Sequence, residues 1–148
     1  MKKFEFTLGR MLSYQQTLLD KEKGNLAAMY ARRNELEASR DAYHDRYLEA
    51  CAIKTAAVAK GVTALEFACK ERDIVVLRDK EKEISDRLLV QEQKIEKQRQ
   101  IVMELSQKVA GYEKLRDKQW DEYQKAQQKA ESEQILEMVS GKLVREGL

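Results

Sequence analysis

The chain contains no proline, and its 148 residues include only two cysteines, one histidine and one tryptophan. Because proline interrupts helices, its absence beside abundant Ala, Glu, Lys, Gln, Leu and Arg is typical of long helices. With 36% charged residues and three Phe, the composition is also poor for a globular core. We therefore expect an all-α rod rather than a globule.

The scarcity of reactive side chains argues against catalysis. Cys51 and Cys69 form no CxxC pair, and with His44 as the only histidine they do not make a metal site. We expect both cysteines to be buried or half-buried reduced thiols, and we interpret His44 as a solvated residue beside the helix contact rather than a general base. Catalysis needs convergent groups in a pocket, so we expect no enzyme, cofactor, metal or small-molecule substrate.

The chain also lacks a region in which charges of one sign predominate. The 28 basic and 26 acidic residues are interleaved and give a formal charge of +2, which leaves no basic face for nucleic acid. No apolar run approaches the roughly 18 residues of a membrane span. Met1, Lys2 and Lys3 resemble the start of a signal peptide, but Glu5 and Arg10 interrupt any apolar core, so we expect no export by that route.

What the sequence does contain is a regular apolar seam. Nine positions with alternating spacings of four and three residues run along one stretch, and seven of them are apolar or aromatic: Ile84, Leu88, Gln91, Ile95, Gln98, Val102, Leu105, Val109 and Tyr112. The residues between them are mostly Lys, Glu, Gln and Arg, so the stripe is narrow, as in one half of a coiled coil. Such a helix needs a partner to be stable.

The partner is predicted within the same chain, because the same spacing runs from Leu8 to Ala57. Phe4, Phe6 and Leu8 alternate with polar residues as in a short strand, but the seam overrides this pattern, and we expect a first helix over about 6–59. Charged residues interrupt this seam at Glu22, Arg33, Arg40 and Lys54, as expected where a seam is partly open or is recognised by another molecule.

A turn is predicted near Gly61, which can adopt the left-handed conformation that ends a helix. Thr63 and Glu66 then have the spacing of a capping box. We expect a turn and short tip helix over about 60–71, a return helix over about 72–140 and a frayed C-terminal end. The predicted fold is therefore a single long antiparallel two-helix coiled-coil hairpin with a short tip helix.

Two surfaces are candidates for protein binding. Tyr43 and Tyr47, one helical turn apart, are either exposed docking residues or seam residues. Ile74 to Leu77 are four consecutive apolar residues, more than one seam can bury. Past Tyr112 the seam weakens, and either a change of register or a surface for a partner explains this.

Sequence motifs at both ends resemble one family. Phe4-Glu5-Phe6-Thr7-Leu8-Gly9-Arg10-Met11-Leu12-Ser13-Tyr14 is similar to the opening of the flagellar export protein FliJ family: Phe, any residue, Phe, any residue, Leu, two residues, then an apolar pair and a tyrosine. Residues 112–119 and 131–137 are similar to its C-terminal arm. The resemblance covers nearly the whole chain and implies a hairpin stalk in the pore of the hexameric flagellar export ATPase FliI.

The resemblance also implies binding residues. The paired chain ends would bind the ATPase through Phe4, Phe6, Leu8, Arg10, Leu12, Gln134, Leu136 and Glu137. The export gate FlhA would bind, through its cytoplasmic domain, to Tyr43, Tyr47, Ile74 and Leu77. Arg40 stands where family members can have an apolar residue, which leaves the extent of this patch open. The resemblance further implies export chaperones as partners and a cytoplasmic position at the membrane face of the flagellar base.

Two alternatives stay open. The equivalent stalk of a virulence type III secretion system would have similar seams, and neighbouring genes would distinguish it. A generic cytosolic coiled-coil adaptor or chaperone would instead form an obligate homodimer without an intramolecular hairpin.

Overall fold

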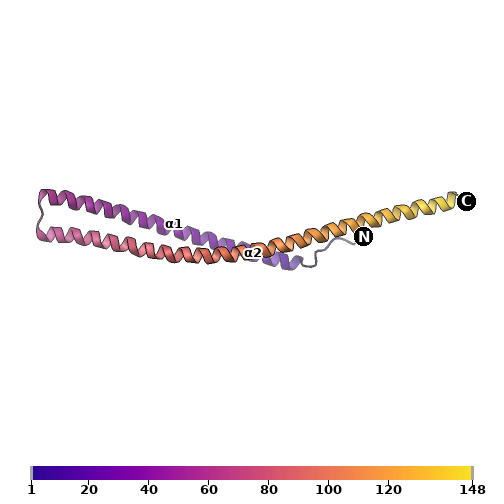
Figure 1. Ribbon diagram of the computed structural model, residues 1–148, viewed down its shortest axis with the longest axis horizontal. Helices are drawn as coiled ribbons and strands as arrows, with labels where there is room; N and C mark the ends of the chain where they lie inside the picture. The colour runs from indigo at the N-terminus through magenta and orange to yellow at the C-terminus, as the bar shows by residue number, and fades with distance from the viewer. Residues whose placement is uncertain (1, 148) are drawn as a thin grey trace. The chain divides into compact units, whose positions relative to one another are not determined.

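The computed structural model describes residues 2–147 and consists of two helices, α1 (Gly9–Lys60) and α2 (Ala64–Glu146) (Figure 1). The helices pack against each other as a hairpin, which confirms the predicted all-α class. Contacts along the chain fall into two compact units, which we describe separately. The first, the turn unit, contains residues 21–102; the second, the end unit, contains residues 1–20 and 103–148.

The turn follows the predicted chemistry. Gly61 has a φ of +89°, a conformation that side chains disfavour. The Glu66 amide donates to the Thr63 hydroxyl over 3.2 Å, and the Thr63 amide donates to the Glu66 carboxylate over 3.3 Å, which confirms the capping box. The prediction of a separate tip helix is wrong. The capping box starts α2 at Ala64, and residues 64–72 contain no glycine or proline that would interrupt the helix.

The turn unit is closed by the predicted seam. Its buried apolar side chains come from both helices, and Leu36 of α1 packs with Ile84 and Leu88 of α2, with Tyr43 against them. Ile74 and Ile95 are also buried. Figure 1 shows α1 and α2 side by side in this unit, joined by the short turn. The spacing of four and three residues therefore identifies the buried face correctly.

Cross-helix pairs maintain one constant register in the turn unit. Lys54 contacts Glu71, Arg78 donates to the Tyr47 hydroxyl over 2.9 Å, His44 lies 3.0 Å from Glu81, and Arg33 lies 4.0 Å from Glu92. Each step back along α1 is matched by an equal step forward along α2, as antiparallel pairing requires. A single exposed pair contributes about 0.2–1 kcal/mol, but a shift of register would break all of them together.

The end unit packs around Leu12, Leu19 and Val109, which are buried. The first helix begins at Gly9 rather than near Phe6. Residues 2–6 form no regular secondary structure, and Thr7 and Leu8 form a turn in which the Gly9 amide donates to the Phe6 carbonyl over 3.0 Å. Phe4, Phe6 and Leu8 are half-buried, whereas Glu5 and Thr7 are exposed. Burial therefore alternates along this segment, although residues 2–8 form no strand. We call residues 2–8 the N-terminal strap.

The C-terminal boundary also differs from the expectation. The predicted helix end near residue 140 is wrong, because α2 continues through Gly141 to Glu146. Nothing lies within 4 Å of the position that a Cβ atom would take at Gly141, so this glycine accommodates no close contact. The residues after it, Lys142 to Glu146, are helical rather than frayed.

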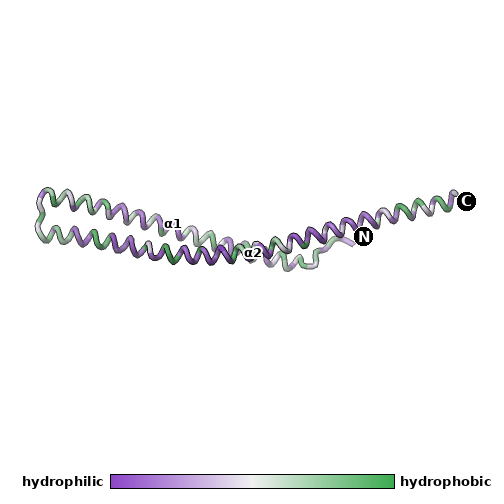
Figure 2. The backbone as a smooth tube through the Cα atoms, in the orientation of Figure 1, coloured by the Kyte–Doolittle hydropathy of each residue, from purple (hydrophilic) through white to green (hydrophobic). Residues whose placement is uncertain are grey.

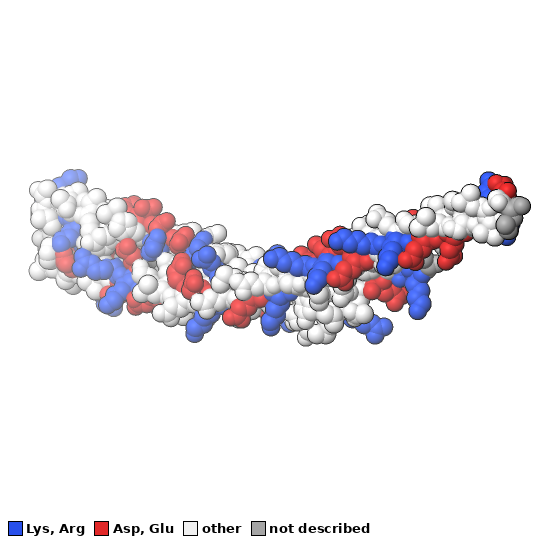
Figure 3. Space-filling view, turned by 45° about the vertical axis from the view of Figure 1, so that its right-hand side comes forward, with Lys and Arg blue, Asp and Glu red and all other residues white. Residues whose placement is uncertain are grey.

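Hydropathy and charge vary along the surface. The turn end of both helices is greener, and therefore more apolar, than the middle of α2 (Figure 2). On the face shown in Figure 3, acidic and basic side chains alternate over most of the surface, with whiter stretches at the turn end and near the C-terminal end. The interleaving of both signs in the sequence is thus also a property of this surface.

Candidate functional site

The tyrosine pair predicted to bind a partner is half-buried rather than free. Tyr43 packs against the Leu36, Ile84 and Leu88 cluster. The Tyr47 hydroxyl accepts a hydrogen bond from Arg78, and this bond raises the pKa of the Arg78 guanidinium. Each tyrosine therefore contributes part of its surface to the helix contact and leaves the rest accessible.

The apolar run on α2 divides between core and surface. Ile74 is buried at 7% exposure and Leu77 is half-buried, whereas Val75 and Val76 are about half exposed. The predicted surplus of apolar side chains is therefore present, but it lies at Val75 and Val76 rather than at Ile74. The spacing of three and four residues would by itself have separated Ile74 and Leu77 from the exposed valines between them, because Ile74 and Leu77 continue the seam back from Ile84.

The sequence interpretation missed further apolar surface around the turn. Five large apolar side chains there are at least two-fifths exposed: Leu48, Ile53, Val58, Leu65 and Phe67. Lys54 lies over the ring of Phe67, with its Nζ 5.2 Å from the ring centre. The signal that could have located this surface is the low share of charged residues between Cys51 and Cys69, where the sequence has only Lys54, Lys60 and Glu66. The apolar side chains of this stretch outnumber the positions that the seam can bury.

His44 has a partner that the sequence did not suggest. Its Nδ1 lies 3.0 Å from a Glu81 carboxylate oxygen across the hairpin, and its ring lies 6.2 Å from that of Tyr47. The imidazole is half exposed, so it joins the cross-helix pairs at the surface. His44 therefore lies beside the helix contact, as expected, but the sequence interpretation did not include its contact with Glu81.

The N-terminal strap lies on α2 through an aromatic cluster. The ring centre of Phe4 is 5.0 Å from that of Trp120, edge to face, and 5.4 Å from that of Tyr123. The Tyr123 hydroxyl donates to the main-chain carbonyl of Lys2 over 2.8 Å. Trp120, which falls off the predicted seam, is therefore the residue on which the strap docks.

The other residues predicted to bind an ATPase differ in exposure. Arg10 is exposed, Leu8 is half-buried and Leu12 is buried at 4% exposure, so Leu12 belongs to the core of the end unit. Gln134, Leu136 and Glu137 are all exposed on α2. The structure thus places the predicted N-terminal and C-terminal residues in one unit, but it does not bring them into a single cluster.

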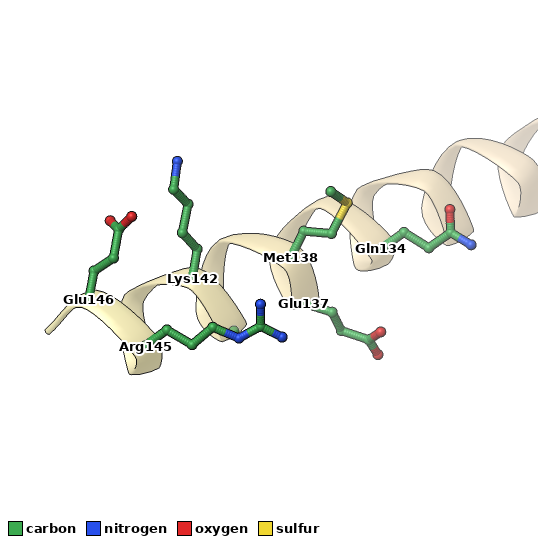
Figure 4. A pocket seen from close by; sticks show the side chains of 7 residues that line it. Gln134, Glu137, Met138, Lys142, Arg145 and Glu146 are labelled. Atoms are coloured by element: carbon green, nitrogen blue, oxygen red, sulfur yellow. The ribbon is translucent and has the colours of Figure 1, made fainter. Parts of the chain in front are cut away.

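The last part of α2 is a helix surface without cover in the described chain. We call residues 129–146 the α2 end segment; every residue from 131 to 146 is exposed. Figure 4 shows the hollow along one side of it, beside Gly141, where Glu137 points away from Lys142 and Glu146. Arg145 extends along the helix toward Glu137, on the side away from Lys142 and Glu146.

The two free cysteines of the chain differ in exposure. Cys51 is half-buried and Cys69 is exposed, so the expectation that both are sheltered is wrong for Cys69. Within residues 2–147 no three His, Cys, Asp or Glu side chains group closely enough to hold a metal ion. None of the described helices combines the length and apolarity needed to span a membrane.

The candidate site therefore consists of three surfaces: the turn surface of Leu48, Ile53, Val58, Leu65 and Phe67, the N-terminal strap with its aromatic cluster, and the α2 end segment. Comparison of the chain with protein-family models, curated protein sequences and solved structures finds no match.

Proposed function

We propose that the chain is a non-enzymatic coupling component of the bacterial flagellar type III protein export apparatus, resembling FliJ. The observation that carries the proposal is the end unit, in which residues 1–20 and 103–148 form one compact body. The end motifs imply that both chain ends bind the FliI-type export ATPase together, and a shared body supports such a joint role.

At the other surface, we propose contact with the cytoplasmic domain of an FlhA-type export gate. The accessible parts of Tyr43, Tyr47 and Leu77 would contact it directly, and the buried Ile74 would support them from below. Val75 and Val76 extend the same stretch with exposed apolar area. In this role the protein would work at the cytoplasmic face of the membrane and assist the handling of export chaperones.

The ATPase part of the proposal is tested with the purified export ATPase. Leu136→Asp places a charge on the α2 end segment, where the side chain is 64% exposed, and Leu89→Asp makes the same change in the turn unit at 66% exposure. We expect wild-type protein and Leu89→Asp to bind and stimulate the ATPase, and Leu136→Asp to lose most of the stimulation. Wild-type protein that neither binds nor stimulates the ATPase would overturn the proposal.

The gate part needs a control for stability, because Tyr43 belongs to the packed cluster. Tyr43→Ala with Tyr47→Ala should weaken gate binding at a temperature where circular dichroism shows both helices intact. Tyr14→Ala with Tyr30→Ala is the matched control on the same helix. Equal binding by both double variants would exclude the tyrosine pair as the gate contact.

The alternatives make different predictions. A stalk of a virulence secretion system would bind the needle-complex ATPase, and neighbouring genes for needle components would favour it. A coiled-coil adaptor that dimerises only between chains is at odds with the intramolecular hairpin, in which Gln91 of α2 bonds to α1 of the same chain.

A further inference from the structure

We propose that the α2 end segment pairs with the same segment of a second copy of this chain, in antiparallel orientation. The inference does not rest on the proposed function. It follows from the exposure, the apolar spacing and the order of charges along residues 129–146.

The first observation is the amount of uncovered apolar surface. Large apolar side chains that are at least half exposed occur repeatedly in this stretch: Ile135, Leu136, Met138, Val139, Leu143 and Val144. An isolated helix of this length is marginally stable in water, and it gains stability when an apolar face packs against a partner. The segment therefore has the surface of a helix that lacks its second half.

The second observation is that three of these residues, Leu136, Val139 and Leu143, form a new stripe together with Ser132. The intramolecular seam continues along α2 through Tyr112, Gln119 and Tyr123, whereas Ser132, Leu136, Val139 and Leu143 repeat at four and three residues but one position earlier. One residue corresponds to about 100° around a helix. The stripe of the end segment thus belongs to a different face of α2 from the seam that α1 and the N-terminal strap cover, and implies a different partner.

The third observation is self-complementarity. Antiparallel pairing centred between Glu137 and Met138 places Leu136 opposite the partner's Val139, and Ser132 opposite the partner's Leu143. The same register places Lys129, one heptad before Leu136, opposite the partner's Glu146. Because the arrangement is two-fold symmetric, each of these pairs occurs twice.

Charges on the flank agree with the same register. Glu131, Lys142 and Arg145 lie on one side of the stripe, and in antiparallel pairing equivalent sides of the two helices meet. Glu131 would then face the partner's Lys142 and the partner's Arg145. A parallel pair would instead set Lys129 against Lys129 and Glu146 against Glu146, which is unfavourable. The order of charges therefore selects the antiparallel arrangement.

The expected affinity is modest. Eighteen helical residues extend over roughly 27 Å, and a contact of this length falls below the area of about 1,200 Å² that typifies stable interfaces. We expect a reversible dimer with a Kd on the order of 100 µM.

Sedimentation equilibrium of the purified full chain tests the proposal, from about 5 µM to 1 mM at low salt. We expect the mass to rise from that of one 17.2-kDa chain toward twice that value. Leu136→Asp should keep the chain monomeric, whereas Leu89→Asp, at an exposed position of the turn unit, should not. Circular dichroism at low concentration confirms that both variants remain helical.

A charge exchange tests the register. Lys129→Glu alone and Glu146→Lys alone each create two like-charge pairs, so both should raise the Kd several-fold. Mixing these two variants, or combining both changes in one chain, restores opposite charges and should restore dimerisation. Lys114→Glu is the matched control outside the segment and should have little effect.

The outcomes are decisive. A constant monomer mass up to 1 mM overturns the proposal, as does a dimer that Leu136→Asp leaves intact. A dimer that Leu136→Asp abolishes but charge exchange does not rescue refutes the antiparallel register. No ATPase or gate protein is present, so failure of self-pairing leaves the proposed function unaffected, and the reverse also holds.

Discussion

The side-chain amide of Gln98 in α2 donates to the main-chain carbonyl of Glu22 in α1 over 3.0 Å, and also to the Glu22 carboxylate. One heptad away, Gln91 donates to the main-chain carbonyl of Met29 over 3.0 Å. Both glutamines are less than a tenth exposed. A buried polar side chain is costly without hydrogen bonds, so these residues favour the one register that supplies carbonyl partners.

Replacing Gln91 tests whether its buried amide contributes to the free energy of unfolding or mainly favours one register of the two helices. We expect Gln91→Leu to raise the free energy of unfolding by about 1 kcal/mol, because an apolar side chain in the seam avoids the desolvation of an amide. Gln91→Ala should lower it, since the packed stem is lost as well. Urea denaturation followed by circular dichroism measures both. If Gln91→Leu is as destabilising as Gln91→Ala, the hydrogen bond to Met29 is a net source of stability.

Two adjacent leucines provide a matched test of the seam. Leu88 is 7% exposed and Leu89 is 66% exposed. We expect Leu88→Ala to reduce the free energy of unfolding by about 2–4 kcal/mol through lost burial and a cavity, and Leu89→Ala to change it by less than about 0.5 kcal/mol. Thermal or urea unfolding of the two variants measures both changes in the free energy of unfolding. Similar losses would show that the seam lies on another face.

The Glu22–Gln98 contact predicts a dependence of stability on pH. Hydrogen bonds from Gln98 and then Asn25 lower the pKa of the Glu22 carboxyl below its ordinary value of 4.5. A group with a lowered pKa in the folded state stabilises that state above its ordinary pKa, and the contribution is lost as the pH falls through the lowered value. Urea midpoints between pH 7 and pH 3 should therefore fall more for the wild type than for Glu22→Gln.

The control for this pH series is Glu104→Gln, the same change at an exposed position of α2. Its midpoints should follow those of the wild type. A Glu22→Gln variant with the wild-type pH profile would show that the carboxylate contributes nothing through Gln98.

The single tryptophan reports on the N-terminal strap. Trp120 is partly covered by the Phe4 ring. We expect Phe4→Ala to expose the indole and shift its fluorescence to longer wavelength, while Thr7→Ala, at an exposed strap position, leaves the spectrum unchanged. An unaltered spectrum for Phe4→Ala would mean that the strap does not rest on Trp120 in solution.

The helices and their buried face followed from the sequence because periodicity is a local property. Ile84, Leu88 and Ile95 were assigned to the seam by spacing alone, and Thr63 with Glu66 located the start of α2. The tip helix was wrong because Val62, Leu65, Phe67 and Ala68 were assigned to a separate short helix, although nothing after Thr63 ends α2.

The sites were harder to predict, because they depend on which side chains meet. No spacing rule could pair Phe4 with Trp120, whose contact joins the N-terminal strap to a part of α2 far along the chain. The tyrosines at 43 and 47 lie at seam positions, yet how much of each ring stays exposed depends on Arg78 and the Leu36 cluster across the hairpin. The binding roles of these residues remain predictions.

The position of the turn at Gly61 also affects the order in which the hairpin assembles. Closing the short loop between Lys54 and Glu71 loses less chain entropy than closing the longer one between Arg33 and Glu92. Pairing should therefore begin beside the turn and proceed away from it, because each closed pair raises the effective concentration of the next pair. The turn at Gly61 would thus set the order in which the two halves of the seam pair during folding.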